Sequence, residues 1–257
     1  MAIITFISDF GYSDHYVAAV KGKILQVDPG LQIVDISHSI QHFDLAHCSH
    51  VLKMVFKDFP TGTVHLIAVN SNPREDEALV ALELENHYFV GADNGIFGLI
   101  SDKEPTKAVA IAHPDSTSES FPARDVLANV AARLAKGDSL DKLGEPLPSV
   151  KRLLGRSMRA TKKQISGHVV RVDHYGNLIT NIEKQAFDIL SKERNFKVVF
   201  GRENVSKIHK TIHNTGSGDV FVVFNSLGYL EVGINHGNAS ELLGLQYDSP
   251  INIIFEE

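Results

Sequence analysis

The sequence is poor in cysteine: of its 257 residues, Cys48 alone carries a thiol. A single thiol cannot form an intramolecular disulfide or build a cysteine metal cage, and such usage is typical of a reducing compartment. We therefore expect a cytoplasmic protein. No stretch approaches the roughly 20 apolar residues of a membrane span. The apolar run at residues 3–7 is too short for a signal core and lacks a basic flank, so we expect neither membrane insertion nor secretion.

Positive charge is also scarce. The chain has 25 Lys and Arg against 31 Asp and Glu, a formal net charge of −6 and a pI near 6.1. Binding to a phosphate backbone needs clustered Lys and Arg, and only one short basic run occurs, within residues 151–163. We expect no nucleic-acid partner. Small molecules and further copies of the chain are the expected partners.

Several common nucleotide and hydrolase motifs are absent. The sequence contains no Gly-x-Gly-x-x-Gly, no Gly-Lys-Thr phosphate loop and no Gly-x-Ser-x-Gly. Dinucleotide binding, nucleoside triphosphate binding and serine hydrolysis therefore lose their main support.

The first half has the βαβ rhythm of a mostly parallel sheet. Apolar, β-branched runs alternate with helical patterns, and a tight turn at Glu85-Asn86-His87 joins two further strands as a hairpin. Ser13 or Asp14 could cap the first helix, and Gly137 ends the last one. The predicted strands are 3–7, 32–36, 63–69, 79–84 and 88–91, and the predicted helices are 14–27, 44–56 and 124–136. The fold class is thus α/β, with an N-terminal mostly parallel-sheet domain over residues 1–145.

The second half reads differently. Residues 146–163 contain two prolines and the basic run, which is typical of an interdomain linker. Beyond it, short strands are separated by Gly, Asn and Ser turns, with one helix near 183–190. This pattern predicts a smaller C-terminal β-barrel-like domain over residues 164–257. Its predicted strands are 165–172, 196–200, 220–224, 229–234 and 251–255.

Polar residues and glycine directly follow several predicted strands. Asp9 comes one residue after the first, where its carboxylate could bind a vicinal diol; the other interpretation is a cap or turn aspartate. Asn94 lies in an Asp-Asn-Gly sequence that is also typical of an ordinary turn. Three polar loops, at 173–177, 225–230 and 235–239, follow strands of the second half. Together these positions predict a site for a nucleoside-like ligand.

Histidines are concentrated in one segment. His38, His42, His47 and His50 lie within thirteen residues, and the last two have the i, i+3 spacing of a helical metal pair. No further ligand completes a pattern with them. We interpret them as solvated or capping side chains and expect no metal site.

The order of motifs resembles one known family. The sequence is similar to the S-adenosylmethionine hydroxide adenosyltransferase family, which includes the bacterial fluorinase and chlorinase, from residue 3 to about 255. The resemblance implies the two domains predicted above and a homotrimer with ligand sites between one subunit's N-domain and its neighbour's C-domain. The motifs that carry it are Ser8-Asp9-Phe10-Gly11, Val34-Asp35-Ile36-Ser37-His38, Gly62-Thr63-Val64-His65, Asp93-Asn94-Gly95, Asp173 to Asn177, and Asn225 to Leu230 followed by Asn235.

The resemblance also implies roles for individual residues. Asp9 would hold the ribose diol, and Phe121 would pack beside the adenosyl group. Asn177 and the loop from Asn235 to Ala239 would bind adenine. The methionine end would contact Ser226 and its neighbours. Phe10, Asn94 and Tyr229 complete the expected set of ligand contacts. S-adenosylmethionine would be substrate or ligand, and no cofactor is expected.

The sequence departs from the hydrolysing branch at the reacting loops. Where that branch has an aspartate, this chain has Asn70, and where it has a histidine, this chain has Pro122. An amide cannot take a proton from water, and proline offers no side-chain hydrogen bond. Arg74 is close enough along the chain to replace the missing arginine. Asn70 and Arg74 are therefore the candidate catalytic residues, with the acidic residues 75–77 as candidate substitute bases.

Three functions remain open at this stage. The first is hydrolysis of S-adenosylmethionine to adenosine and methionine by displacement at ribose C5′. The second is a catalytically inactive binder of adenosine or S-adenosylmethionine, because the binding loops persist where the reacting loops do not. The third is another adenosyl transfer, including a halide-dependent one, for which the small Ala123 would suit but the threonine-rich loop is missing.

Overall fold

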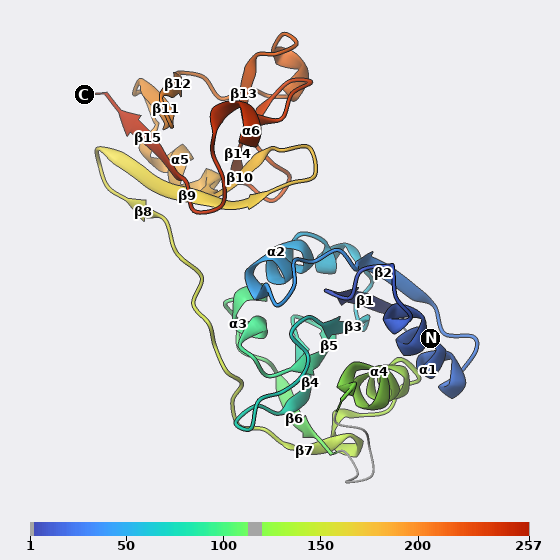
Figure 1. The fold of residues 1–257 in the computed structure, drawn as a ribbon. Helices are drawn as coiled ribbons and strands as arrows, with labels where there is room; N and C mark the ends of the chain where they lie inside the picture. The colour runs from blue at the N-terminus through green and yellow to red at the C-terminus, as the bar shows by residue number, and fades with distance from the viewer. Residues whose placement is uncertain (1–2, 113–119, 257) are drawn as a thin grey trace. The chain divides into compact units, whose positions relative to one another are not determined.

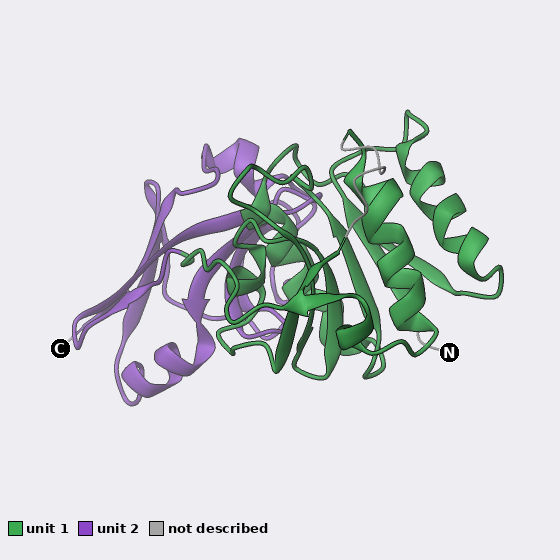
Figure 2. Cartoon of the chain, turned by 90° about the horizontal axis from the view of Figure 1, so that it is seen from below, with its two compact units in different colours: residues 1–155 green, residues 156–257 purple. Residues whose placement is uncertain are grey.

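The computed structural model describes residues 3–112 and 120–256 of the chain (Figure 1). The chain divides into two units, residues 1–155 and 156–257, coloured separately in Figure 2. The predicted linker is shared between them: its residues up to Gly155 belong to the first unit, and those from Arg156 onward belong to the second.

The described part of unit 1 is built on a seven-stranded sheet of order β2-β1-β3-β5-β4-β6-β7. The first four strands in that order run parallel, whereas β4, β6 and β7 pair antiparallel. The mostly parallel α/β domain expected from the sequence is thereby confirmed. The strands are β1 (Ile4–Ser8), β2 (Ile33–Ser37), β3 (Val64–Ala68), β4 (Leu79–Leu84), β5 (His87–Ala92), β6 (Lys107–Ile111) and β7 (Gly144–Pro146).

Helices cover both faces of this sheet. α1 (Tyr16–Val27) and α4 (Ala128–Ala135) pack on one face in a core that includes Ile4 and Phe6. α2 (Leu45–Val55) and α3 (Ile96–Ile100) share the other core with Ile7. Successive side chains of a strand point to opposite faces, so a strand with helices on both sides is apolar along its length. β1 is accordingly buried throughout.

Local sequence signals predicted the hairpin and one helix end correctly, but not the capping of the first helix. Glu85 and Asn86 both have positive φ, as a two-residue hairpin turn requires, and β4 pairs antiparallel with β5 as predicted. Gly137, with φ 101°, follows the last residue of the third predicted helix. The predicted capping of the first helix is wrong: the N-cap is His15, and no side chain caps it.

Several elements were not predicted, α3 and β6 among them. α3 is too short to show a helical period, and β6 alternates only between alanine and larger residues. β10 (Leu178–Glu183) follows a turn directly, without a break in composition. The helix predicted from 124 begins instead as a π-helical turn at Ala123–Leu127 and becomes α4 at Ala128. Short 3₁₀ turns occur at Phe56–Asp58, Leu140–Lys142 and Ile212–Asn214.

Unit 2 is a nearly closed, barrel-like antiparallel sheet, as expected. Its path is β12-β11-β15-β9-β10-β14-β13, with β8 (Arg159–Ala160) added on β9. The long β9 (Gln164–Val172) pairs with β15 through its first half and with β10 through its second. The other elements are α5 (Lys184–Leu190), β11 (Phe196–Phe200), β12 (Glu203–Val205), β13 (Val220–Phe224), β14 (Tyr229–Ile234), α6 (Ala239–Leu243) and β15 (Pro250–Phe255).

Within residues 3–112 and 120–256, every helix is too short or too polar to cross a lipid bilayer.

Candidate functional site

Asp9 lies at the carboxyl end of β1, held by two neighbouring segments. Its Oδ2 accepts the backbone N–H of Phe43 at 2.9 Å and the backbone N–H of Asn70 at 3.3 Å. The residue is only 9% exposed. Both of these bonds fall on Oδ2, so the backbone of the two segments fixes the carboxylate. The predicted contact of Asp9 with a ligand diol stays a prediction.

Phe43 is a neighbour of Asp9 that sequence reasoning missed. It lies between β2 and α2, has φ 62°, and leaves its ring 72% exposed. The next residue, Asp44, caps α2 by accepting the N–H of His47, and the sequence predicts a helix that begins at this residue. The hydrogen bond between Phe43 and Asp9 could not be predicted from the sequence, because it joins segments 34 residues apart in the chain.

Aromatic side chains gather beside this strand end. The ring centroids of Phe10 and Phe121 lie 5.7 Å apart in an edge-on contact, and Tyr16 is 5.4 Å from Phe121. Arg124 stacks over Phe121 at 5.3 Å while its guanidinium makes two hydrogen bonds to Asp125. Phe10 and Phe121, predicted separately as ligand contacts, are therefore brought together by the fold.

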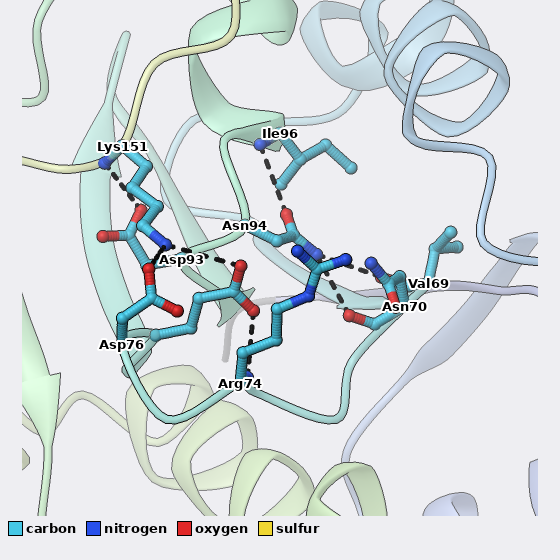
Figure 3. A network of polar contacts seen from close by, with 9 residues as sticks. Val69, Asn70, Arg74, Asp76, Asp93, Asn94, Ile96 and Lys151 are labelled. Atoms are coloured by element: carbon cyan, nitrogen blue, oxygen red, sulfur yellow. Dashed lines mark hydrogen bonds and ion pairs between the residues drawn. The ribbon is translucent and has the colours of Figure 1, made fainter.

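The loop after β3 is fastened by Asn94, as Figure 3 shows. Asn94 Nδ2 donates to the carbonyls of Asn70 at 3.1 Å and Val69 at 3.4 Å, and its Oδ1 accepts Ile96 N at 3.3 Å. The amide is thus occupied by backbone groups. Here Asn94 supports the loop, and the ligand contact predicted for it stays a prediction.

Asn70 itself has φ 47°, a left-handed conformation that asparagine and aspartate tolerate better than most residues. Its backbone is engaged on both sides, by Asp9 and by Asn94. The position where the hydrolysing branch has an aspartate therefore lies directly against the predicted ribose-binding carboxylate.

The rest of this loop is tied to Lys151. The Lys151 ammonium lies 2.7 Å from Asp76 Oδ2 and 3.5 Å from Glu77 Oε1, and Glu77 Oε2 accepts Arg74 N at 3.1 Å. Lys151 N donates to Asp93 Oδ1 at 2.8 Å, and burial raises the pKa of the Asp93 carboxyl. The exposed Arg74 side chain extends in the direction of Asn70 in the view of Figure 3. Two of the three candidate substitute bases are therefore already ion-paired.

Pro122 is buried at the start of the π-helical turn, with φ −58°. Arg124 N and Asp125 N both donate to the carbonyl of Phe121. Pro122 therefore stands at the start of this helix, where its own missing N–H costs little, and Phe121 directly precedes it. Ala123, the small residue noted above, is completely buried.

In unit 2, the turn from Asp173 to Asn177 is closed by its own carboxylate. Asp173 Oδ1 accepts Tyr175 N at 2.9 Å and Asn177 N at 2.8 Å, and Oδ2 accepts Asn177 Nδ2 at 3.1 Å. Gly176 has φ 83°, and a Cβ there would lie 2.0 Å from Asn238 Oδ1, so only glycine fits.

The predicted loop from Asn235 to Ala239 meets this turn. Ser240 N donates to the carbonyl of Gly176 at 2.9 Å, which brings buried Ala239 next to Asn177. Asn235 is 9% exposed, and its Nδ2 donates to Thr215 O at 2.9 Å, so that amide is used within the protein.

The turn from Asn225 to Tyr229 lies at the other end of β14, where Tyr229 pairs with Glu183 and the carbonyl of Gly228 accepts Lys184 N. Asn225 Oδ1 accepts Leu227 N and Tyr229 N, while Ser226 is exposed. Burial, together with the charge of Asp173, raises the pKa of Glu231, which lies two residues beyond Tyr229 on that strand. The predicted loops at 173–177 and 235–239 therefore meet at one end of β14, whereas the turn from Asn225 to Tyr229 lies at its other end.

The histidine-rich segment forms no metal cluster among the described residues. His47 Nδ1 accepts Gln41 N at 3.1 Å, and His38 is buried against Ser8.

Comparison with known proteins identifies the family. Residues 4–144 match the model of the SAM hydroxide adenosyltransferase N-terminal domain, and residues 167–252 match that of the C-terminal domain. The chain is 30% identical to an (R)-S-adenosyl-L-methionine hydrolase of Methanocaldococcus jannaschii over 98% of this chain and 96% of the relative. It is 26% identical to a fluorinase of an Actinoplanes species over 91% of each.

A solved structure of an uncharacterized conserved protein from Thermotoga maritima has a TM-score of 0.89 and 29% identity, covering 98% of this chain and 100% of that one. Both halves of the chain thus match, in the expected order. The chain belongs to the SAM hydroxide adenosyltransferase family, where SAM is S-adenosylmethionine.

Proposed function

We propose that this protein hydrolyses S-adenosylmethionine to adenosine and methionine. Relatives about 30% identical over nearly the whole chain, from Methanocaldococcus jannaschii and Thermus thermophilus, are named (R)-S-adenosyl-L-methionine hydrolases. The observation that carries the proposal is the hydrogen bond from Asn70 N to Asp9 Oδ2. It joins the loop at the reacting position to the carboxylate that would hold the ribose.

The chemistry is a displacement at ribose C5′. A water oxygen attacks C5′, the C5′–S bond breaks, and its electron pair stays on sulfur, so methionine leaves as a neutral thioether. The attacking water loses one proton, giving adenosine, methionine and H⁺. Because the sulfonium is already an activated leaving group, alignment of water and substrate supplies much of the rate enhancement.

The residues of unit 1 divide this work. Asp9 Oδ1 accepts the ribose hydroxyls and so fixes the sugar, while Phe10 and Phe121 form an apolar wall. The side-chain oxygen of Asn70 accepts a hydrogen of the attacking water and orients it without removing the proton. Asp76 and Glu77 are paired with Lys151, which lowers the pKa of Asp76 and holds both carboxylates in place. The proton therefore passes to solvent water.

One specific feature favours the second candidate, a binder without activity. Asn70 and Pro122 offer no general base at the two positions where the hydrolysing branch has aspartate and histidine. A halide-dependent transfer would need no base either.

A product assay separates these functions. Pure protein is incubated with each sulfonium epimer of S-adenosylmethionine, with and without chloride or fluoride, and the products are separated by chromatography. Equal amounts of adenosine and methionine, formed from the (R) epimer named in the relatives, support hydrolysis. Intact substrate with measurable binding would leave the binder, and a 5′-halo-adenosine would establish halide transfer.

We also propose an oligomeric state for this protein. Family resemblance favours a homotrimer with ligand sites between subunits. Light scattering during size-exclusion chromatography measures the mass of the assembly and so tests this. A monomer at assay concentration would refute this part of the proposal alone.

A further inference from the structure

Ser8 and His38 form a completely buried pair directly beside Asp9. Ser8 is the last residue of β1, and His38 follows the last residue of β2. The distance between Ser8 Oγ and His38 Nδ1 is 2.7 Å, and both residues are 0% exposed. Ser8 Oγ also lies 3.4 Å from Phe10 N, which donates to it. The pair therefore bonds to the backbone on the far side of Asp9.

The protons of this pair follow from its partners. Ser8 Oγ accepts the Phe10 N–H, so its single hydrogen is free to be donated to His38 Nδ1. On the other side of the ring, His38 Nε2 lies 3.1 Å from Asp35 Oδ1, outside the alignment of a good hydrogen bond. A carboxylate there favours the neutral ring with its hydrogen on Nε2.

Electrostatics and packing hold the ring in that state. Burial lowers the pKa of His38. Burial alone would raise the pKa of Asp35, but Lys21, whose Nζ donates to it at 2.6 Å, and the nearby His38 ring lower it overall. The rings of Phe6 and Tyr12 contact the imidazole at centroid distances of 4.6 and 5.1 Å.

The main chain adds a second tie. Gly11 N donates to the carbonyl of His38 at 2.8 Å. The turn from Ser8 to Gly11 is therefore fixed to His38 at both ends, and Asp9 lies between the two ties.

We propose that His38 is a positioning residue, which acts through Ser8 to aim the Asp9 carboxylate at the ribose hydroxyls of the ligand. His38 is itself 0% exposed, so its role would be exerted through Ser8 and not by direct contact with the ligand. The inference rests on the proposed function for the identity of the ligand, an adenosyl group, but not for the hydrolysis step.

The same sheet contains a matched control. Thr5 Oγ1 and His65 Nδ1 are also 2.7 Å apart, and both residues are 0% exposed. This pair joins β1 to β3 and continues to His87, 3.2 Å from His65, rather than to Asp9. Loss of this pair should therefore lower stability without changing the affinity for the ligand.

The test compares binding of adenosine with binding of 2′,3′-dideoxyadenosine, which lacks both ribose hydroxyls. Calorimetry is applied to wild type, Ser8→Ala, His38→Leu, His38→Asn and His65→Leu, each checked for folding by thermal unfolding. Asparagine places an acceptor near the position of Nδ1 and so keeps a partner for Ser8. Leucine removes it.

We expect Ser8→Ala and His38→Leu to weaken adenosine binding about tenfold or more, with dideoxyadenosine unchanged. His38→Asn should recover most of the lost affinity, and His65→Leu should lower the melting temperature alone. Where substrate turns over, the loss should raise KM more than it lowers kcat. Equal losses for both nucleosides, an equal loss in His65→Leu, or full adenosine affinity in His38→Leu would overturn the inference.

Should His38→Leu not fold, Ser8→Ala and His38→Asn decide the question by the same comparison. A wild-type protein that binds adenosine but leaves S-adenosylmethionine intact would refute hydrolysis, and the affinities would still decide the role of His38. A wild-type protein that binds no adenosine would overturn both.

Discussion

The backbone N–H of Phe43 lies 2.9 Å from Asp9 Oδ2. This contact and the one from Asn70 N both hold Oδ2, so main-chain groups fix the orientation of this side chain. The orientation of Asp9 therefore depends on the fold and not on the identity of residues 43 and 70.

Replacing Asp9 should abolish the recognition of ribose hydroxyls. In Asp9→Asn, the single amide oxygen satisfies the two backbone N–H groups, and an NH₂ group replaces Oδ1 at the ligand. We expect adenosine affinity to fall at least about tenfold, as measured by calorimetry. Asp14→Asn, an exposed aspartate before α1, is the control. Undiminished affinity in Asp9→Asn would show that the ribose binds elsewhere.

Restoring an acid at position 70 should increase turnover. Asn70→Asp keeps the side-chain shape and tolerates the left-handed backbone, while it supplies a group able to accept a proton from water. We expect adenosine formation to rise about tenfold or more under single-turnover conditions. Asn72→Asp places the same charge at an exposed position of the same loop and should change nothing. A rate gain in both variants would indicate a general effect of charge.

Stability should fall as the pH drops below neutrality. Burial, and then the neighbouring His87, lower the pKa of His65 from 6.5 to about 3. Between these two pH values the unfolded chain therefore binds more protons than the folded protein. The contribution of the neutral His65 to stability is fully present above pH 6.5 and is lost as the pH falls toward 3. From His65 alone, the unfolding free energy at pH 5 should be about 2 kcal/mol below that at pH 7.

Urea titrations from pH 5 to 7 measure this slope. His65→Asn should flatten it, and His42→Gln, at an exposed position, serves as control. Burial also lowers the pKa of His38, His87 and His168, so part of the slope should survive in His65→Asn. An unchanged slope in that variant would show that His65 is not the main source.

Two of the contacts of Lys151 should contribute very differently to stability. Its ion pair with Asp76 joins side chains 40% and 72% exposed, and pairs of that kind contribute at most about 1 kcal/mol. Its backbone N–H is bonded to Asp93, which is buried. Asp93→Ala should therefore cost about 1–3 kcal/mol, whereas Lys151→Ala should cost less. Denaturant unfolding measures both, with Asp93→Asn, which retains the acceptor, as the matched control. A larger loss in Lys151→Ala would reverse this order.

Hydrolysis should need no added metal. The leaving sulfur is already positively charged and departs neutral, so no Lewis acid is required to stabilise it. Protein treated with EDTA and desalted should retain its rate of adenosine formation within about twofold, since a required metal ion would contribute several kcal/mol. A loss that is restored by one divalent cation would contradict this prediction.

The parts of the fold that sequence reasoning predicted are those with local causes. The hairpin at Glu85 and Asn86 and the helix end at Gly137 rest on backbone conformations that few residues adopt easily. β1 and β3 were found because strands buried on both faces are almost continuously apolar, whereas β2 is a half-exposed edge strand that was found from its β-branched residues. β6 and α3 were missed because their stability comes from packing against β4 and α2, which leaves little trace in their own residues.

The sequence by itself determined the order of the elements, the α/β and barrel-like halves, and which residues carry the family's motifs, because each is written in short stretches of chain. Only the tertiary structure decided that Asp9 Oδ2 accepts two backbone N–H groups, that Asn94 fastens a loop, that Lys151 pairs with Asp76 and Glu77, and that His38 contacts Ser8. These contacts join residues up to 75 positions apart. They depend on strand order and on which buried polar groups must find partners, and no local pattern of residues specifies either.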